Sequence, residues 1–314
     1  MGKVRLPKIV VIVGPTASGK SVLAVRLARR VGGEIVSADS RLLYKGMDIG
    51  TAKPPRDSGA PRRMTGPALY MSSGVPHHLI DVAMPSRTLT LADYKRRAIR
   101  AIRGILKRGR VPILVGGTGL YVRAIVDNLQ IPEVPPDMKY RASLERKGKG
   151  WILKRLKKLD PDYAARIGPN PRYATRALEV MRATGKPFGA QQGKGEPLFD
   201  ALVVGIDPGK KALDVRIDRR IDAMVKTGLV VEVKKLARRY AWDLPSMSGI
   251  GYRELKAHFE GDISLKEAID DIKTNTRRYA KRQMTWWRRI NKVKWFRTPS
   301  EAFRVSENWL KSGK

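Results

Sequence analysis

Short apolar runs alternate along the chain with longer segments in which apolar residues recur every three or four positions. The short runs predict strands, which we expect at Lys8–Gly14, Glu34–Asp39, His77–Val82, Val111–Gly116 and Ala201–Asp207. The longer segments predict helices, which we expect at Ser21–Val31, Leu91–Arg108, Val215–Tyr240 and, as one long basic helix, at 264–289. Alternating strands and helices are typical of βαβ units, so we expect an α/β fold in which helices flank a mostly parallel sheet.

The pattern changes between the fourth and fifth predicted strands. Residues 132–197 have proline- and glycine-rich segments at both ends and helical periodicity between them. We therefore expect a small helical subdomain there, inserted into a core formed by residues 1–131 and 198–314. Residues 51–76 are rich in Pro, Gly and Ser, which predicts a long and partly mobile connection within the core.

Composition excludes several classes of protein. The chain of 314 residues contains no Cys, which excludes disulfides and zinc–thiolate sites and fits a reducing compartment. No apolar stretch approaches the length of about 18 residues that a membrane span needs. The apolar run near the N-terminus leads into a glycine-rich loop instead of a signal-peptide cleavage site. We expect a cytoplasmic monomer that needs no membrane.

Charge is the strongest feature of the composition. The chain has 64 Lys and Arg residues against 29 Asp and Glu residues, and its formal net charge is +35. A surface with this charge attracts polyanions, most commonly nucleic acid. A general adaptation toward basic or more soluble proteins is the alternative interpretation. The excess is larger than about ten phosphate contacts would require, and the sequence does not explain the remainder.

A phosphate-binding loop follows the first predicted strand and opens the first predicted helix, as in a P-loop NTPase. It has the pattern Gly-x4-Gly-Lys-Ser and consists of Gly14, Pro15, Thr16, Ala17, Ser18, Gly19, Lys20 and Ser21. Backbone N–H groups of such a loop surround an anion at the positive end of a helix, so we expect the N–H groups of residues 16–21 to point inward. Lys20 is expected to reach terminal phosphate oxygens, and Ser21 to ligate Mg2+.

The loop alone does not determine what happens to the phosphate. A P-loop NTPase places a carboxylate that holds magnesium near the loop, whereas the fourth predicted strand ends in Gly116, Gly117 and Thr118. This sequence favours a bound diphosphate whose terminal phosphate is not hydrolysed. Because the fifth predicted strand ends in Asp207, an RNA-binding P-loop NTPase stays an alternative.

Asp39 ends the second predicted strand, and the carboxyl ends of parallel strands line the ligand crevice of an open sheet. Its carboxylate is therefore expected beside the phosphate loop. There it can act as a catalytic base, or it can cap a helix that begins in "RLLY". The Thr118 hydroxyl is expected to face the same crevice, again with helix capping as the alternative. The residues alone leave both alternatives open.

Several sequence blocks resemble, in order, the motifs of the tRNA dimethylallyltransferase (isopentenyl-tRNA transferase) family. They are GPTASGKS, SADSRLLYKGMDIGTAKP, PHHLID, ILVGGTGLY, RALEVMRATGK, GIGYRE and RRYAKRQMTWWRR. The resemblance runs from residue 8 to about residue 296 and therefore covers nearly the whole chain. The lack of Cys and of a C-terminal extension is similar to the bacterial form of the family.

The resemblance implies a transferase that moves a dimethylallyl group from dimethylallyl diphosphate to the exocyclic N6 amine of the adenosine directly 3′ of the anticodon, in tRNAs that read UNN codons. Diphosphate is then the leaving group, held by the phosphate loop, Mg2+ and Arg220, which shares a helix face with Arg216. Asp39 is the implied catalytic base, Lys20 stabilises the leaving group, and Thr118 contacts the target adenosine. An adenylate isopentenyltransferase acting on free AMP, ADP or ATP is the alternative enzyme.

The resemblance also implies contacts with the tRNA anticodon stem-loop, partly through the inserted subdomain. They are expected at Asp39, Ser40, Arg41, Leu42, Thr118, Arg141, Arg172, Tyr173, Ala174, Thr175, Arg176, Ser248, Gly249, Ile250, Gly251, Tyr252, Arg253, Lys281, Arg282, Gln283, Met284, Thr285, Trp286, Trp287 and Arg288. The last block combines cations with aromatic residues, which suits phosphate neutralisation and base stacking. We expect one of its two tryptophans to be buried. Because the target adenine is stacked in the tRNA, it must be extracted into a channel that it shares with the diphosphate.

Overall fold

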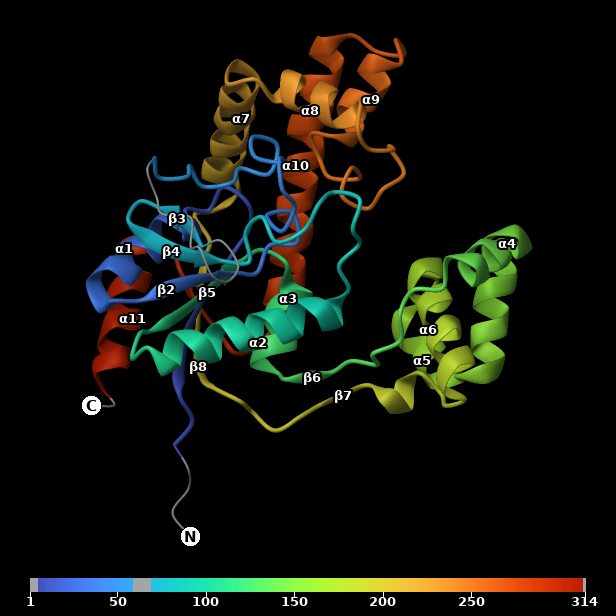
Figure 1. Cartoon of the computed structure of the whole chain (residues 1–314), viewed down its shortest axis with the longest axis horizontal. Helices are drawn as coiled ribbons and strands as arrows, with labels where there is room; N and C mark the ends of the chain where they lie inside the picture. The colour runs from blue at the N-terminus through green and yellow to red at the C-terminus, as the bar shows by residue number, and fades with distance from the viewer. Residues whose placement is uncertain (1–4, 59–68, 313–314) are drawn as a thin grey trace. The chain divides into compact units, whose positions relative to one another are not determined.

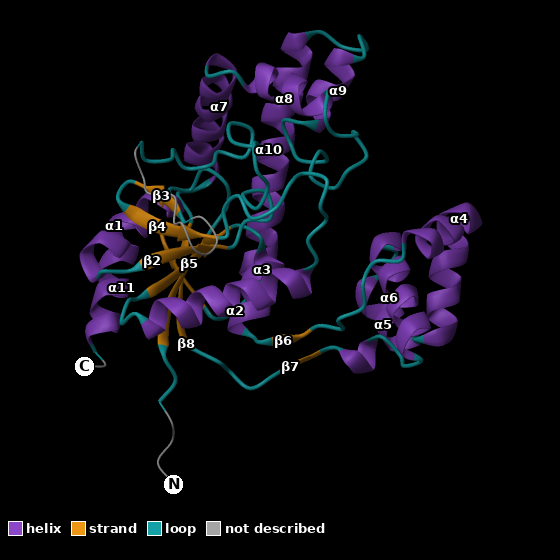
Figure 2. Cartoon of the chain, in the orientation of Figure 1, coloured by secondary structure: helices purple, strands orange, loops and turns teal. Residues whose placement is uncertain are grey.

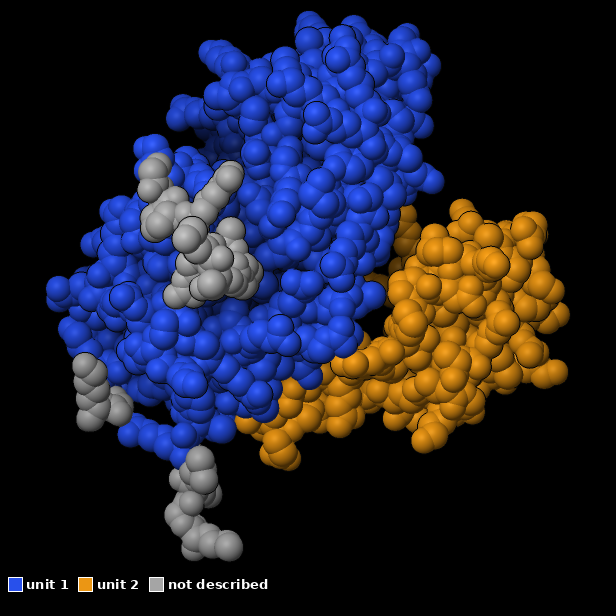
Figure 3. All heavy atoms as spheres, viewed as in Figure 1, with its two compact units in different colours: residues 1–126, 198–314 blue, residues 127–197 orange. Residues whose placement is uncertain are grey.

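The computed structural model describes residues 5–58 and 69–312 of the chain. The chain divides into two compact units. Unit 1 contains residues 1–126 and 198–314, and unit 2 contains residues 127–197 (Figure 3). The described residues of unit 1 form two hydrophobic cores, and those of unit 2 form a separate one.

Unit 1 is built around a seven-stranded sheet with the strand order β3-β4-β2-β5-β1-β8-β9 (Figure 1). The strands are β1 (Lys8–Val13), β2 (Glu34–Ser37), β3 (Tyr70–Ser72), β4 (Val75–His78), β5 (Pro112–Gly116), β8 (Asp200–Ile206) and β9 (Val293–Phe296). Neighbouring strands are parallel except β3 and β4, which are antiparallel. The expected α/β fold with a mostly parallel sheet is therefore confirmed.

Helices cover both faces of this sheet (Figure 2). α1 (Lys20–Val31) and α11 (Pro299–Lys311) pack on one face, and α2 (Leu91–Lys107) and α3 (Gly119–Val126) pack on the other. The other described helices of unit 1 are α7 (Lys210–Lys226), α8 (Leu229–Ala237), α9 (Arg253–Phe259) and α10 (Leu265–Arg288), of which α8 and α9 lie away from the sheet at the top of Figure 2. Along β1, Ile9, Val11 and Val13 belong to one core with α2, α3 and α10, and Val10 and Ile12 belong to another with α1 and α11. Successive side chains of a strand point to opposite faces, so β1 is apolar from Ile9 to Val13 because both faces are buried there.

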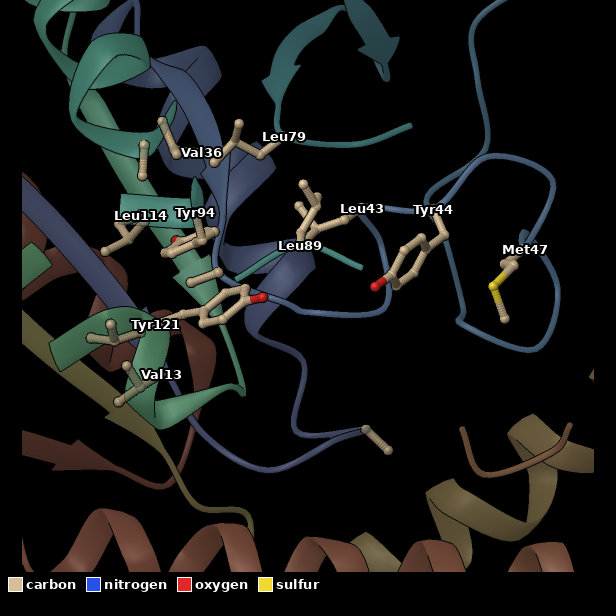
Figure 4. Packing of buried hydrophobic residues seen from close by; sticks show 14 of the residues in the cluster. Val13, Val36, Leu43, Tyr44, Met47, Leu79, Leu89, Tyr94, Leu114 and Tyr121 are labelled. Atoms are coloured by element: carbon tan, nitrogen blue, oxygen red, sulfur yellow. The ribbon is translucent and has the colours of Figure 1, made fainter. Parts of the chain in front are cut away.

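The larger core includes residues beside the carboxyl ends of the central strands (Figure 4). There the rings of Tyr94 on α2 and Tyr121 on α3 stack with their centroids 3.7 Å apart. The Tyr94 hydroxyl donates a hydrogen bond to the Ser37 carbonyl at 3.1 Å. These contacts fix two helices against the end of β2, two residues before Asp39.

Several elements differ from the sequence-based expectations. The segment Val215–Tyr240 forms part of two helices, because Gly228 adopts a φ of 106° and ends the helical path between α7 and α8. The strand expected at His77–Val82 ends at His78, since Leu79 and Asp81 have left-handed backbones with φ of 63° and 56°. The expected connection 51–76 includes β3 and the start of β4, and its residues 59–68 lie outside the described residues.

Unit 2 consists mainly of three helices: α4 (Met138–Leu159), α5 (Pro161–Ile167) and α6 (Pro171–Thr184). Two short antiparallel strands, β6 (Leu129–Gln130) and β7 (Gly193–Lys194), pair where the chain enters and leaves the unit. Its core includes Leu156, Leu178 and Phe188. Gly148 has a φ of 81° and a ψ of 159°, so α4 is kinked at this residue.

No helix in the described part of either unit is long and apolar enough to cross a membrane.

Candidate active site

The phosphate loop connects β1 to α1, as its sequence pattern predicts. Gly14 has a φ of 143°, and a Cβ atom there would lie 2.7 Å from the carbonyl oxygen of Ile206. Gly19 has a φ of 96° and immediately precedes the first residue of α1, Lys20. Both positions therefore need glycine. The first N–H groups of α1 have no acceptor within the helix, so they are available to an anion in the loop.

Two N–H groups of the loop are already engaged, contrary to the expectation that residues 16–21 all point inward. The N–H of Thr16 donates to Oε1 of Gln283 at 2.8 Å. The N–H of Ser18 donates to the Pro15 carbonyl at 3.3 Å, which closes a turn inside the loop. The anion cradle is thus formed by fewer backbone donors than the sequence pattern suggests.

A cavity of about 1000 Å3 opens beside the loop, and Lys20, Ser21, Asp39 and Arg220 all line it. The Lys20 ammonium donates to the Pro15 carbonyl at 2.9 Å. Burial lowers the pKa of Lys20 from 10.5 to about 8, an effect that the nearby Asp39 carboxylate opposes and the Arg220 charge strengthens. Lys20 therefore keeps most of its positive charge at neutral pH, beside a carboxylate and a second cation.

Arg220 reaches the loop from α7 and lies 204 residues after Thr16 in the chain. Its guanidinium donates to the Thr16 hydroxyl at 3.4 Å. Burial lowers the pKa of the Arg220 guanidinium, which also lines the cavity. Lys20 and Arg220 together provide two cations for a diphosphate.

Asp39 lies two residues beyond the end of β2, and turns follow it instead of a helix. The helix-cap alternative is therefore wrong. Its Oδ1 atom accepts the N–H of Arg41 at 2.9 Å, which stabilises the turn. Among the described residues, Oδ2 has no hydrogen-bond partner. One carboxylate oxygen can thus hold the local backbone while the other faces a ligand.

Thr118 connects the ends of β5 and β2. Its Oγ1 accepts the N–H of Ser40 at 3.1 Å, and its N–H donates to the Ala38 carbonyl at 3.2 Å. A Cβ atom at Gly116 would lie 2.1 Å from that same carbonyl oxygen. The hydroxyl is thus bonded beside Asp39 rather than to the first turn of α3.

The expected tRNA contacts Arg41 and Ser248 meet in the structure. The Arg41 guanidinium donates to the carbonyls of Pro245 and Ser246 at 2.6 and 3.1 Å, and to the Ser248 hydroxyl at 3.3 Å. These bonds hold the segment after Asp39 against the segment that leads to α9. Tyr252 is fully buried, and its hydroxyl donates to Glu232 at 2.8 Å, so its side chain contacts protein.

Sequence reasoning did not identify Glu232. Its carboxylate accepts the backbone N–H groups of Asp48, Ile49 and Gly50 at 2.7 to 3.0 Å, in addition to the Tyr252 hydroxyl. It thereby fixes the loop 48–50 against α8. The lone acidic residue in the apolar stretch "LVVEV" is a signal that could have indicated it.

The end of α10 has one exposed and one buried face. The exposed residues are Lys281, Arg282, Thr285 and Arg288, and the buried ones are Gln283, Met284 and Trp287. Trp287 is 1% exposed, which confirms that one of the two tryptophans is buried. Trp286 is half-buried against Gly119, where a Cβ atom would lie 1.9 Å from the indole ring.

In unit 2, the expected contacts divide between the surface and the core. Arg141 and Arg176 both donate to Glu179, which is 2% exposed. Burial alone would raise the pKa of Glu179, but these two guanidinium groups hold it below its usual value. Arg172 and Tyr173 are exposed on α6, Thr175 is half-buried, and Ala174 is fully buried.

Asp207, which kept the NTPase alternative open, follows β8 and has partners of its own. Its Oδ1 accepts the N–H of Gly209 at 3.0 Å, and its Oδ2 lies 3.5 Å from the Arg288 guanidinium. Across the described residues, no group of three or more His, Asp or Glu side chains could hold a metal ion. The Ser21 hydroxyl lines the cavity beside the loop and is an oxygen ligand of the kind that Mg2+ accepts.

Comparisons with known proteins agree on one family. The family model described as IPP transferase matches residues 42–290. The chain is 46% identical over 292 residues to the tRNA dimethylallyltransferase of Roseiflexus sp. (strain RS-1), with 91% of each chain covered. It is 44% identical to the enzyme of the same name from Geobacillus kaustophilus, covering 92% of this chain and 90% of the other.

Solved structures resemble the fold over the same length. The full-length tRNA isopentenylpyrophosphate transferase from Bacillus halodurans matches with a TM-score of 0.68 and 39% identity, covering 97% of this chain and 96% of the other. A eukaryotic dimethylallyltransferase acting on tRNA matches with a TM-score of 0.72 and 30% identity, covering 89% and 69%.

Proposed function

This chain belongs to the IPP transferase family, and from that premise we propose that it is a tRNA dimethylallyltransferase. It transfers a dimethylallyl group from dimethylallyl diphosphate to the exocyclic N6 amine of the adenosine directly 3′ of the anticodon, in tRNAs that read UNN codons. The observation that carries the proposal is the single cavity that Lys20, Arg220 and Asp39 line together.

The phosphate loop and the two cations bind the donor and stabilise its leaving group. As the bond between the allylic carbon and oxygen breaks, negative charge develops on the diphosphate. Lys20 and Arg220 lie where they neutralise that charge, and charge stabilisation in a partly buried site is a large contribution to catalysis. The allylic carbon becomes cation-like and bonds to the amine nitrogen.

Asp39 acts on the acceptor. An exocyclic amine of adenine is a weak nucleophile, and it must lose a proton when its nitrogen bonds to carbon. Oδ2 of Asp39, which has no protein partner among the described residues, accepts this proton, while Oδ1 stays bonded to the Arg41 N–H. Thr118, whose Oγ1 accepts the Ser40 N–H beside Asp39, contacts the same adenosine in this proposal.

Magnesium fits the donor set of this site. Mg2+ usually keeps several waters and binds through one or two protein oxygens plus substrate phosphates. The Ser21 hydroxyl at the start of α1 lines the cavity and is the residue that would hold it. Bound there, the ion would neutralise charge on the diphosphate.

The exposed cations of α10 bind the RNA in this proposal. Lys281, Arg282 and Arg288 share the face of α10 that is open to solvent, where they can neutralise phosphates. Arg172 and Tyr173 in unit 2 are exposed and add contacts with the anticodon stem-loop. A monomeric state and a cytoplasmic location are part of the same proposal.

Purified protein tests the function directly. With dimethylallyl diphosphate and Mg2+, we expect it to prenylate unmodified tRNA at the adenosine 3′ of the anticodon, as read by mass spectrometry of nucleosides. Equal prenylation of free AMP would favour an adenylate isopentenyltransferase. Hydrolysis of ATP that RNA stimulates, without prenyl transfer, would favour an RNA-binding NTPase.

A further inference from the structure

Gln283 lies where three parts of the active site meet. It belongs to α10, yet its side chain is only 7% exposed. Its Oε1 accepts the N–H of Thr16 in the phosphate loop at 2.8 Å, and its Nε2 donates to the carbonyl of Gly117 after β5 at 3.0 Å. One amide group therefore holds two loops that are about a hundred residues apart in the sequence.

The position of Gly117 fits this contact closely. A Cβ atom there would lie 2.3 Å from Nε2 of Gln283, so a larger residue would displace the amide. The following residue, Thr118, bonds to Ala38 and Ser40, which flank Asp39. A continuous set of hydrogen bonds thus runs from the anion cradle through Gln283 to both neighbours of Asp39.

The chemistry of the side chain suits such a link. An amide offers an acceptor and a donor at the same end, whereas an ionised Glu offers acceptors only and Met offers no donor and only a weak sulfur acceptor. Burial increases the contribution of these bonds to stability, because a buried backbone group without a hydrogen-bond partner loses the free energy of its contact with water. Lys281 and Arg282 are exposed, whereas the buried Gln283 side chain offers RNA very little surface.

We propose that Gln283 is a positioning residue that fixes the phosphate loop relative to the turn carrying Thr118, and so sets the distance between the diphosphate and the Asp39 carboxylate. This inference rests on the proposed prenyl transfer. It assigns Gln283 to the reaction geometry and not to tRNA contact. Misplacement of reacting groups by about 1 Å can slow a reaction by about 10²-fold, so the link has a large kinetic effect.

Gln283→Met tests the link, since Met has a similar length and forms neither bond. We expect kcat to fall about 10- to 10²-fold and KM for dimethylallyl diphosphate to rise, with tRNA affinity changed less than about twofold. Calorimetry with inorganic diphosphate should show weaker binding, and this readout does not depend on prenyl transfer. Ile272→Ala is the control, because Ile272 is a buried residue of the same helix outside the site; it should lower thermal stability and leave KM unchanged.

A double-mutant cycle separates the link from general packing. Gly117→Ala should reproduce the loss in kcat, because the added methyl group displaces the Gln283 amide. Combined with Gln283→Ala, it should add little, since the two changes remove the same interaction. Fully additive losses would overturn the inference.

The outcomes also separate this inference from the proposed function. If the parent protein transfers no prenyl group to tRNA, the proposed function is overturned. The role of Gln283 is then tested only by comparing the diphosphate affinity of the parent protein with that of Gln283→Met. If the parent protein is active and Gln283→Met keeps its kcat, donor KM and diphosphate affinity, the positioning role is overturned. A variant that loses tRNA affinity alone would instead make Gln283 an RNA contact.

Discussion

The Asp39 carboxylate and the Lys20 ammonium lie near enough for Asp39 to oppose the fall in the pKa of Lys20, and both side chains line one cavity. Lys20 follows β1 and Asp39 follows β2, and β5 lies between these strands in the sheet. The carboxyl ends of the three parallel strands therefore bring the Lys20 ammonium, the Asp39 carboxylate and the Thr118 hydroxyl to one edge. This arrangement suits a reaction in which an anionic leaving group and a proton depart from neighbouring atoms.

The substitution Asp39→Asn tests whether Asp39 acts as a catalytic base or only stabilises the turn that follows it. Asn can still accept the Arg41 N–H through its carbonyl oxygen, but it cannot take up a proton at neutral pH. We expect kcat to fall about 10²- to 10⁴-fold in both Asp39→Asn and Asp39→Ala, while tRNA affinity changes little. Single-turnover rates at saturating tRNA are the measurement. Near-parental rates in Asp39→Asn with a loss only in Asp39→Ala would reduce Asp39 to a structural role.

The pKa of Lys20 predicts an alkaline limit for donor use. The protonated ammonium attracts diphosphate, and its pKa in the free protein is about 8. The charge is therefore present below pH 8 and is lost as the pH rises through this value, so kcat/KM for dimethylallyl diphosphate should decline above it. Lys20→Arg should lower kcat/KM overall but remove this decline, because a guanidinium stays protonated. The same decline in Lys20→Arg would assign it to another group.

The exposed face of α10 predicts a salt-dependent contact. Lys281→Ala with Arg282→Ala should weaken tRNA binding and reduce the slope of log Kd against log salt by about two or less. At saturating tRNA, kcat should stay near the parental value. Lys266→Ala, which removes a charge from the exposed N-terminal turn of α10, is the control and should leave the slope unchanged. An unaltered slope in the double variant would place these cations away from the RNA.

The hydrogen bonds of Glu232 predict that the backbone amides of residues 48–50 are protected from hydrogen exchange. Glu232→Gln replaces an acceptor oxygen with a donor opposite backbone N–H groups, so at least one of those bonds is lost. Amide hydrogen exchange at Asp48, Ile49 and Gly50 should become faster. Tyr252→Phe removes only the hydroxyl bond to the same carboxylate and should change that exchange much less. Equal exchange in all three proteins would show that the loop is held by other contacts.

Local features of the sequence predicted much of the framework. The phosphate loop was found because its pattern, the preceding apolar strand and the following helix are contiguous, and β1 and α1 lie within one residue of their expected bounds. The basic helix was likewise predicted to within a residue at each end, since its periodicity is strong and Ser264 and Glu267 form a capping box at its start. Elements defined by short runs, such as β3 and β9, were not predicted.

Contacts between distant residues were beyond the sequence patterns. Nothing near Arg41 indicates that its guanidinium bonds to carbonyls more than two hundred residues later. A polar residue in a basic block was expected at the RNA surface, so the burial of Gln283 was missed. A signal was present, because Gln283 continues the stripe of Ile272, Ala280 and Trp287 on one side of α10. The need for glycine at position 119, next to Thr118, is likewise visible only in the structure, because there the Trp286 ring packs against it.

The most direct test of the account is a crystal structure of the protein with an anticodon stem-loop and the unreactive donor analogue dimethylallyl S-thiolodiphosphate. It should show the diphosphate within hydrogen-bond reach of Lys20 and Arg220, and the adenine amine nitrogen about 2.6–3.2 Å from a carboxylate oxygen of Asp39. A diphosphate bound elsewhere, or an Asp39 carboxylate separated from the amine by packed protein, would contradict it.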